Sequence, residues 1–190
     1  MKVYTRAGDD GTTGLLFGGR VPKDSAQPVA YGAVDEAQAA LGVARAECEA
    51  GTELDELLVQ LGHDLYVAMA ELATLPDNRP KLTPGATLIT AEMVAGLEPI
   101  IDDLSARFDP PTEFVIPGNN RVSAALDMAR TVVRRAERVA IAAVPGDSQV
   151  VPYLNRLSDL VWVMARWQEG EATTSRSVRG TDARPGPTDP

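Results

Sequence analysis

Arginines spaced one helical turn apart form the most chemically informative group in this sequence. Arg130, Arg134 and Arg138 are four residues apart, so a helix would place them along one side, together with Asp127 and Glu137. Three guanidinium groups at this spacing repel one another, which costs stability unless an anion neutralises them. A solvated charged face is the simpler interpretation. The repulsion nevertheless favours a phosphate-bearing ligand, or buried carboxylates, beside the arginines.

A glycine- and threonine-rich segment near the N-terminus has the composition of an anion-binding loop. Residues 5–14 read Thr-Arg-Ala-Gly-Asp-Asp-Gly-Thr-Thr-Gly, and Lys23 follows shortly after them. Glycines let backbone N–H groups approach an anion, while hydroxyl and guanidinium groups add donors. The segment matches neither the Walker A pattern nor the dinucleotide-binding pattern. A flexible terminus is an alternative as well supported as a binding loop.

Two further polar groups lie within segments of helical periodicity. Asn155 and Asp159 share a helix face, with Trp162 nearby, and an Asn among apolar residues needs hydrogen-bond partners from the fold or from a ligand hydroxyl. Asp35 and Glu36 interrupt an apolar stripe in an earlier segment. A buried Asp there would need a cation, which the arginine-rich helix offers.

The composition narrows the functions that these residues can serve. The chain has 190 residues and a net charge of −9, and its 18 basic residues comprise 15 Arg and 3 Lys. The acidic balance argues against broad nucleic-acid binding, although five of the arginines lie within residues 121–138. One cysteine, Cys48, excludes an internal disulfide, and one histidine, His63, argues against zinc and Ser-His-Asp chemistry. We expect a cytoplasmic protein, because no signal-peptide run or membrane-spanning apolar run is present.

Five helices separated by Gly- and Pro-rich breaks are predicted to position these residues. Apolar residues at spacings of three and four predict helices over residues 24–47, 53–75, 90–108, 121–143 and 150–168. We expect Asp24 or Ser25 to cap the first helix, Asn120 to cap the fourth, and Pro99 to kink the third or start a new turn. Residues 1–22 and 76–88 have loop composition, residues 112–120 contain a short extended piece, and residues 170–190 are expected to be disordered. No segment alternates as a strand does, so the predicted fold is all-α, with one antiparallel five-helix bundle over residues 1–169.

Five motifs, in order along residues 3–168, carry a resemblance to a known family. They are Thr5-Arg6-x-Gly8-Asp9-x-Gly11-Thr12-Thr13, Tyr31-Gly32-x-x-Asp35-Glu36, Phe114–Gly118, Ala129–Arg138 and Tyr153–Leu160. Together they resemble the PduO-type ATP:cob(I)alamin adenosyltransferases. The resemblance implies a homotrimer of five-helix bundles that binds ATP and the corrinoid at subunit interfaces. It also implies transfer of the 5′-deoxyadenosyl group of ATP to the cobalt of cob(I)alamin, forming adenosylcobalamin and triphosphate, with Mg²⁺ on the phosphates.

The resemblance also assigns roles to individual residues. The triphosphate would be wrapped by Thr5, Arg6, Gly8, Asp9, Gly11, Thr12, Thr13 and Lys23. Arg134 and Glu137 would hold the nucleotide, and Asn155 would contact its sugar. Arg130 would pair with Asp35 across a subunit interface and support the site. The residues expected to serve catalysis are Arg130, Arg134, Asn155 and Asp35. Phe114 would press against the lower face of the corrin and help to leave the cobalt four-coordinate. No residue of the chain is assigned as a metal ligand.

Three departures from the family pattern leave an alternative open. Asn119 and Asn120 stand where a second glycine usually follows, and Asp127 precedes Arg130 where the helix usually carries a histidine, which would add negative charge beside the ligand. After Gln168 the family's C-terminal segment is not recognisable. A non-catalytic relative that binds ATP or adenosylcobalamin as a carrier or sensor is the main alternative, and a purely structural bundle is the third. The protein partners that the resemblance suggests are a cob(II)alamin reductase and an adenosylcobalamin-dependent enzyme.

Overall fold

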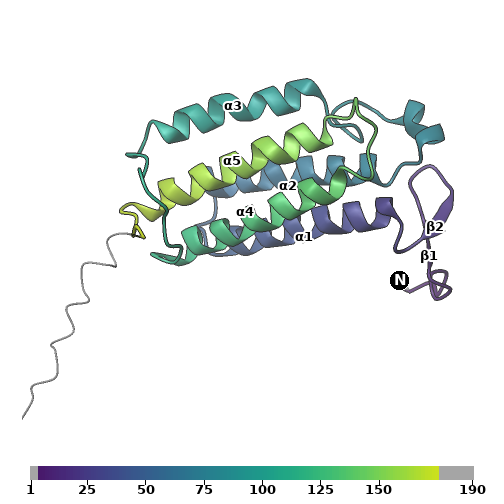
Figure 1. Cartoon of the computed structure of the whole chain (residues 1–190), viewed down its shortest axis with the longest axis horizontal. Helices are drawn as coiled ribbons and strands as arrows, with labels where there is room; N and C mark the ends of the chain where they lie inside the picture. Colours follow the sequence, from purple (N-terminus) through teal and green to yellow (C-terminus); the bar gives the residue numbers. More distant parts are fainter. Residues whose placement is uncertain (1–3, 176–190) are drawn as a thin grey trace, which may run out of the picture.

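Five long helices form the body of the molecule, as a computed structural model that describes residues 4–175 shows (Figure 1). The helices are α1 (Ala26–Ala46), α2 (Glu53–Leu72), α3 (Ala91–Ser105), α4 (Arg121–Ala140) and α5 (Val150–Glu169). Each lies inside or within one residue of its predicted range, and the predicted helices run on by one to three residues past most of the observed ends. Asn120 caps α4 as expected, since its side chain accepts a hydrogen bond from the backbone N–H of Ser123 at 2.8 Å.

The apolar stripes of the helices meet in one core. Buried residues include Val34 and Leu41 of α1, Leu61 and Leu65 of α2, and Leu157 of α5. The buried residues of α4, which packs on α1 and α5, include the three alanines Ala129, Ala136 and Ala140, and these small side chains let the helices approach closely. The described part of the chain has no helix long and apolar enough to cross a membrane.

The antiparallel prediction needs a correction at α3. Consecutive helices alternate in direction, but α3 packs on α5 and runs parallel to it (Figure 1). Two contacts fix this direction. Arg156 pairs with Glu98 at 3.2 Å, and further along both helices the Arg107 guanidinium stacks over the Trp167 ring at 5.3 Å. Pro99 lies inside α3 without ending it.

A β-hairpin and a 3₁₀ helix lie at one end of the bundle, and the hairpin corrects the all-α prediction. Strands β1 (Thr12–Gly14) and β2 (Arg20–Pro22) pair antiparallel in the segment expected to be a loop, and the 3₁₀ helix η1 covers Pro76–Lys81. Strands of three residues are too short to produce an alternating pattern. Ser25 occupies the N-cap position of α1 without a capping hydrogen bond from its side chain.

Glu71 organises the end of the bundle that carries the hairpin. Its buried carboxylate accepts hydrogen bonds from Arg79 Nη2 at 2.9 Å, from Ser148 Oγ at 2.7 Å and from the Ile89 backbone N–H at 2.9 Å. These bonds join the end of α2 to three other segments. The hairpin attaches close by, because the Leu16 N–H donates to the Ala73 carbonyl at 2.8 Å.

The segment after α5 corrects the prediction of disorder from residue 170 onward. Residues 171–175 lie extended against the loop between α3 and α4, with Val115 and Thr174 opposite each other in an antiparallel bridge. The Ile116 N–H donates to the Thr173 carbonyl at 2.8 Å, and the Ser175 N–H donates to the Phe114 carbonyl at 2.9 Å. This pairing is between two short segments far apart in sequence, which helical periodicity does not reveal. The rest of the predicted tail, residues 176–190, lies outside the described residues.

Candidate functional site

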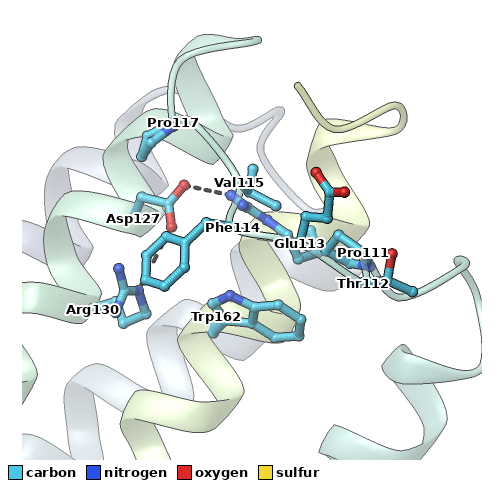
Figure 2. Close-up of a pocket in the computed structure, with 10 residues that line it drawn as sticks. Pro111, Thr112, Glu113, Phe114, Val115, Pro117, Asp127, Arg130 and Trp162 are labelled. Carbon is cyan, nitrogen blue, oxygen red and sulfur yellow. Dashed lines mark hydrogen bonds and ion pairs between the residues drawn. The ribbon is translucent and has the colours of Figure 1, made fainter. Parts of the chain in front are cut away.

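A cavity of about 390 Å³ opens where the loop before α4 crosses α4 and α5 (Figure 2). Its lining combines apolar loop residues with charged helix residues: Pro111, Thr112, Glu113, Phe114, Val115, Pro117, Asp127, Arg130, Trp162 and Arg166. The Phe114 side chain is 86% exposed, which is unusual for a large aromatic residue. Covering such a ring with a flat apolar partner lowers the free energy, because apolar surface is removed from water. The sequence prediction for Phe114 therefore falls on a residue with both the exposure and the position to contact a large ligand.

Buried ion pairs form one wall of this cavity. Arg166 of α5, 3% exposed, pairs with Asp127 of α4, and its Nε lies 3.1 Å from Glu169 Oε2. Arg130 Nε lies 3.7 Å from the other oxygen of Asp127. Burial raises the pKa of the Glu169 carboxyl, Arg166 opposes this rise, and Asp127 adds to it.

The position of Asp127 overturns the expectation that it adds free negative charge beside a ligand. The carboxylate is 5% exposed and bears ion pairs to two arginines, so its charge is neutralised within the protein. The pairing also restrains Arg130, which keeps its side chain partly exposed at the cavity. Sequence reasoning missed Arg166, although a charged residue directly after Val163, Met164 and Ala165 was a signal for a buried partner.

The arginine row of α4 is solvated where it extends beyond the cavity. Arg134 and Arg138 are exposed and have no ion-pair partner among residues 4–175. Asn155 of α5 donates from Nδ2 to Glu137 Oε1 at 2.9 Å, so these two predicted site residues touch each other. The sequence predicted either a phosphate-bearing ligand or buried carboxylates beside these arginines. Arg130 has such a carboxylate in Asp127, whereas Arg134 and Arg138 have none among the described residues. The outer part of the row is therefore open to solvent, and its guanidinium groups are free of ion pairs with the residues that the structure describes.

Asp35 and Glu36 are exposed on α1, which corrects the expectation of a buried Asp. The buried stripe of this helix passes beside them through Val34, Ala37 and Leu41. Glu36 pairs with Arg135 of the neighbouring α4. The Asp35 carboxylate stays open to solvent, and the predicted contact of Asp35 with Arg130 is not made within this chain.

The glycine-rich segment is a structured loop braced by Arg20, which sequence reasoning missed. Arg20 donates from Nη2 to the Ala7 carbonyl at 2.5 Å and from Nε to Thr12 Oγ1 at 3.0 Å. The Asp10 carboxylate accepts the Thr12 backbone N–H at 2.9 Å and the Thr12 hydroxyl at 2.8 Å. These bonds, with a smaller contribution from Arg20, hold the pKa of Asp10 below its usual value. The terminal-flexibility alternative therefore does not describe residues 5–23.

Two backbone features of this loop bear on the predicted phosphate site. A Cβ atom at Gly8 would lie 3.1 Å from Lys23 Nζ, so the absence of a side chain lets the Lys23 ammonium lie directly over the loop backbone. Arg6 has a φ of 61° and Gly11 a φ of 81°, both in the left-handed region. Thr5, Arg6 and Asp9 are exposed on the same loop. The loop thus gathers the predicted donors Thr5, Arg6, Gly8, Gly11, Thr12, Thr13 and Lys23 in one place.

The predicted site residues fall at opposite ends of the bundle within one chain. The hairpin loop lies beside the end of α2, whereas Phe114 and its cavity lie at the far end, where α3 passes into α4 (Figure 1). The α4 row leads from one end toward the other, and α4 has 20 residues, which corresponds to about 30 Å. One chain therefore does not bring the loop and Phe114 together.

Comparisons with known proteins identify the family to which this chain is similar. The family model for cobalamin adenosyltransferase matches residues 3–168. The chain is 45% identical over 170 residues to a corrinoid adenosyltransferase of Mycobacterium tuberculosis strain H37Rv, with 87% of each chain covered. It is 42% identical over 174 residues to a corrinoid adenosyltransferase of Citrobacter freundii, covering 88% of this chain and 95% of that one.

Solved structures of a PduO-type ATP:corrinoid adenosyltransferase from Lactobacillus reuteri share the fold. A phenylalanine-to-alanine variant complexed with cobalamin and ATP superposes with a TM-score of 0.81 at 27% identity, covering 92% of this chain and 99% of that one. An arginine-to-lysine variant complexed with ATP gives a TM-score of 0.76 at 27% identity, covering 88% and 94%. The chain belongs to the cobalamin adenosyltransferase family.

Proposed function

We propose that this protein transfers the 5′-deoxyadenosyl group of ATP to the cobalt of cob(I)alamin, forming adenosylcobalamin and triphosphate. The observation that carries the proposal is the exposed Phe114 ring beside a charged cavity at the start of an arginine row. An apolar ring suits the flat face of a corrin, and unpaired guanidinium groups suit a polyphosphate. Membership of the cobalamin adenosyltransferase family supports the same reaction.

The proposed chemistry requires positioning more than acid–base groups. The cobalt of cob(I)alamin is itself the nucleophile that attacks C5′ of ATP, so the protein mainly has to align the two reactants. Negative charge grows on the departing triphosphate, and Arg134 with the donors of the hairpin loop would stabilise it. Glu137 and Asn155, which already touch each other, would hold the nucleoside part. Mg²⁺ would be bound by the phosphates of ATP.

Phe114 would act on the corrinoid. An apolar ring against the lower face of the corrin offers no ligand to cobalt, so it would favour release of the lower base. A cobalt left four-coordinate in this way is easier to reduce from Co(II) to Co(I). Val115 and Trp162 line the same cavity and would add apolar contact.

We further propose that each site is completed by two subunits of a homotrimer in the cytoplasm. The separation of the hairpin loop from Phe114 supports this, because one chain places them at opposite ends of the bundle (Figure 1). Asp35 on α1 is exposed, and the Arg130 side chain is partly exposed, so both have surface for the contact that we propose across an interface. A cob(II)alamin reductase that supplies the substrate and an enzyme that uses adenosylcobalamin are the proposed protein partners.

An anaerobic assay with ATP, Mg²⁺ and chemically reduced cobalamin tests the proposal. We expect the absorbance spectrum of adenosylcobalamin to appear, and triphosphate to be released in equal amount. Tight binding of ATP or adenosylcobalamin without turnover would refute the proposed catalysis in favour of a carrier or sensor. Lack of binding by a folded protein would leave only a structural bundle.

A further inference from the structure

The backbone of the Phe114 loop is hydrogen-bonded to the segment that follows α5. The Phe114 ring points away from the core, and residues 114–116 make their backbone hydrogen bonds to residues 173–175. A pairing of this length between two short strands is weakly stable on its own. The geometry of the loop therefore depends on what anchors the segment over residues 171–175.

Asn119 supplies this anchor with both ends of its side-chain amide. Its Nδ2 donates to the Glu171 carbonyl at 2.6 Å, and its Oδ1 accepts from the Thr173 hydroxyl at 2.8 Å. The two contacts lie directly beside the backbone bond from the Ile116 N–H to the Thr173 carbonyl. Asn119 thus joins the loop to the segment at two points, and a glycine at this position would make neither contact.

The neighbouring Asn120 fastens the same junction to the bundle. It caps α4 through its Oδ1, and its Nδ2 donates to the Gln168 carbonyl near the end of α5 at 2.7 Å. The position of the segment is therefore set relative to both helices that form the cavity wall. The two asparagines that depart from the expected glycine therefore hold different partners. Asn119 binds the segment over residues 171–175, and Asn120 binds the end of α5.

We propose that Asn119 is a positioning residue that, together with Thr173, holds the Phe114 ring in place at the corrinoid-binding cavity. The inference rests on the proposed function, because it assigns the corrinoid to this cavity. Asn119 acts through the backbone of residues 114–116 and does not itself have to touch the ligand. Loss of its two bonds lets the loop leave its position, which lowers the fraction of protein with Phe114 ready to bind.

The test compares Asn119→Ala and Thr173→Val with the wild-type protein. We expect the KM for the corrinoid to rise about three- to tenfold and the yield of four-coordinate cob(II)alamin, followed by absorbance, to fall. The KM for ATP should stay unchanged, since the side-chain contacts of Asn119 are to Glu171 and Thr173 and not to any residue assigned to ATP. Hydrogen exchange at the Ile116 and Ser175 amides should accelerate in the absence of any ligand. The double variant should show less than the product of the two single effects, because both substitutions break one junction.

Two matched controls separate positioning from general damage. Thr173→Ser keeps the hydroxyl that donates to Asn119, so its KM for the corrinoid should equal that of the wild-type protein. Gln149→Ala removes an amide that donates locally to the Asp147 carbonyl at 3.5 Å, and it should change no readout.

Three results would overturn the inference. Faster amide exchange with an unchanged corrinoid KM would give Asn119 a purely structural role, and equal rises in the KM for ATP and corrinoid would indicate a global effect. Unchanged amide exchange would show that the junction does not hold the loop. If the wild-type protein adenosylates cobalamin and the variants match it in every readout, only this inference is contradicted. If the wild-type protein neither binds nor adenosylates cobalamin, the proposed function is contradicted as well.

Discussion

At the scale of single residues, the arginines of α4 divide by the carboxylates near them. Arg130 is restrained by buried Asp127, and Arg135 pairs with Glu36 of α1. Arg134 lies on the same helix with no ion-pair partner among the described residues. The adjacent Arg134 and Arg135 therefore have different roles open to them. Arg135 joins α4 to α1, whereas Arg134 is available to bind an anion.

The Arg134→Ala variant should bind ATP about 10- to 100-fold more weakly, because a charge-assisted hydrogen bond to a phosphate contributes about 1.5–3 kcal/mol. Isothermal titration calorimetry with Mg-ATP measures the change. The control is Arg135→Ala, which removes the same charge from the next position and loses a surface pair of small energetic value. An equal loss of affinity in both variants would contradict the specific role of Arg134.

Glu169 gives the protein a defined dependence of stability on pH. Burial raises its pKa above the ordinary value of 4.5, so the folded protein retains this proton to higher pH than the unfolded chain does. The unfolded state then binds fewer protons than the folded state over this window, and the free energy of unfolding falls as pH rises through it.

Glu169→Gln removes this ionisation and should therefore be less sensitive to pH than the wild-type protein between pH 4.5 and the raised pKa. Urea unfolding at a series of pH values measures the free energy of unfolding of each protein. The difference between variant and wild type should move in favour of the variant as pH increases. A difference that is constant with pH would contradict the assignment.

At the scale of elements, α4 and α5 are joined beneath the cavity by a charged contact inside an otherwise apolar interface. Asp127 and Arg166 are buried between these helices, and their ion pair is the contact that crosses from α4 to α5 within a group that also holds Arg130 and Glu169. A pair of this kind adds little net stability, yet removing one partner leaves an uncompensated buried charge. The main effect of the pair is to fix the position of Arg130 and of the cavity wall that the two helices form.

Asp127→Ala should lower the free energy of unfolding by about 3 kcal/mol, because the buried Arg166 guanidinium loses its partner on α4 and keeps only its ion pair with Glu169. The double substitution Asp127→Ala with Arg166→Met should be less harmful than the sum of its two single substitutions. Urea denaturation of the four proteins completes a double-mutant cycle. Additive effects would show that the two side chains are not coupled.

The sequence predicted the helices well because each long helix repeats its apolar stripe over several turns. Leu54, Leu58, Leu61 and Leu65 of α2 are an example, and all four are buried. The hairpin could not be predicted in this way, since its strands have three residues each. The pairing of residues 171–175 with the Phe114 loop and the contact of Asp127 with Arg166 both depend on segments that meet only in the folded chain.

At the scale of the whole molecule, the hairpin and the segment between α3 and α4, which carries Phe114, lie at opposite ends of the bundle (Figure 1). This separation leads to a test by subunit mixing. Lys23→Ala impairs the loop and Phe114→Ala impairs the cavity, so each variant alone should be nearly inactive. Refolding the two together should recover a substantial part of the activity, because some interfaces then combine an intact loop with an intact cavity.

Adenosylcobalamin formation, measured against each variant refolded alone, provides the readout for this mixing experiment. Co-refolding each variant with the double variant Lys23→Ala, Phe114→Ala is the matched control. Such mixtures contain only one kind of intact half-site, so they should recover nothing. Recovery in the controls, or its absence in the mixed sample, would contradict a site shared between subunits.

The proposed sharing of each site between two subunits also ties activity to mass action. A site divided between two chains exists only while those chains are associated, so specific activity should fall on dilution below the dissociation constant of the assembly. By the same linkage, a substrate that spans the interface favours association over separated chains. The supply of ATP and corrinoid would thus regulate how much of the protein is assembled, without any dedicated regulatory site.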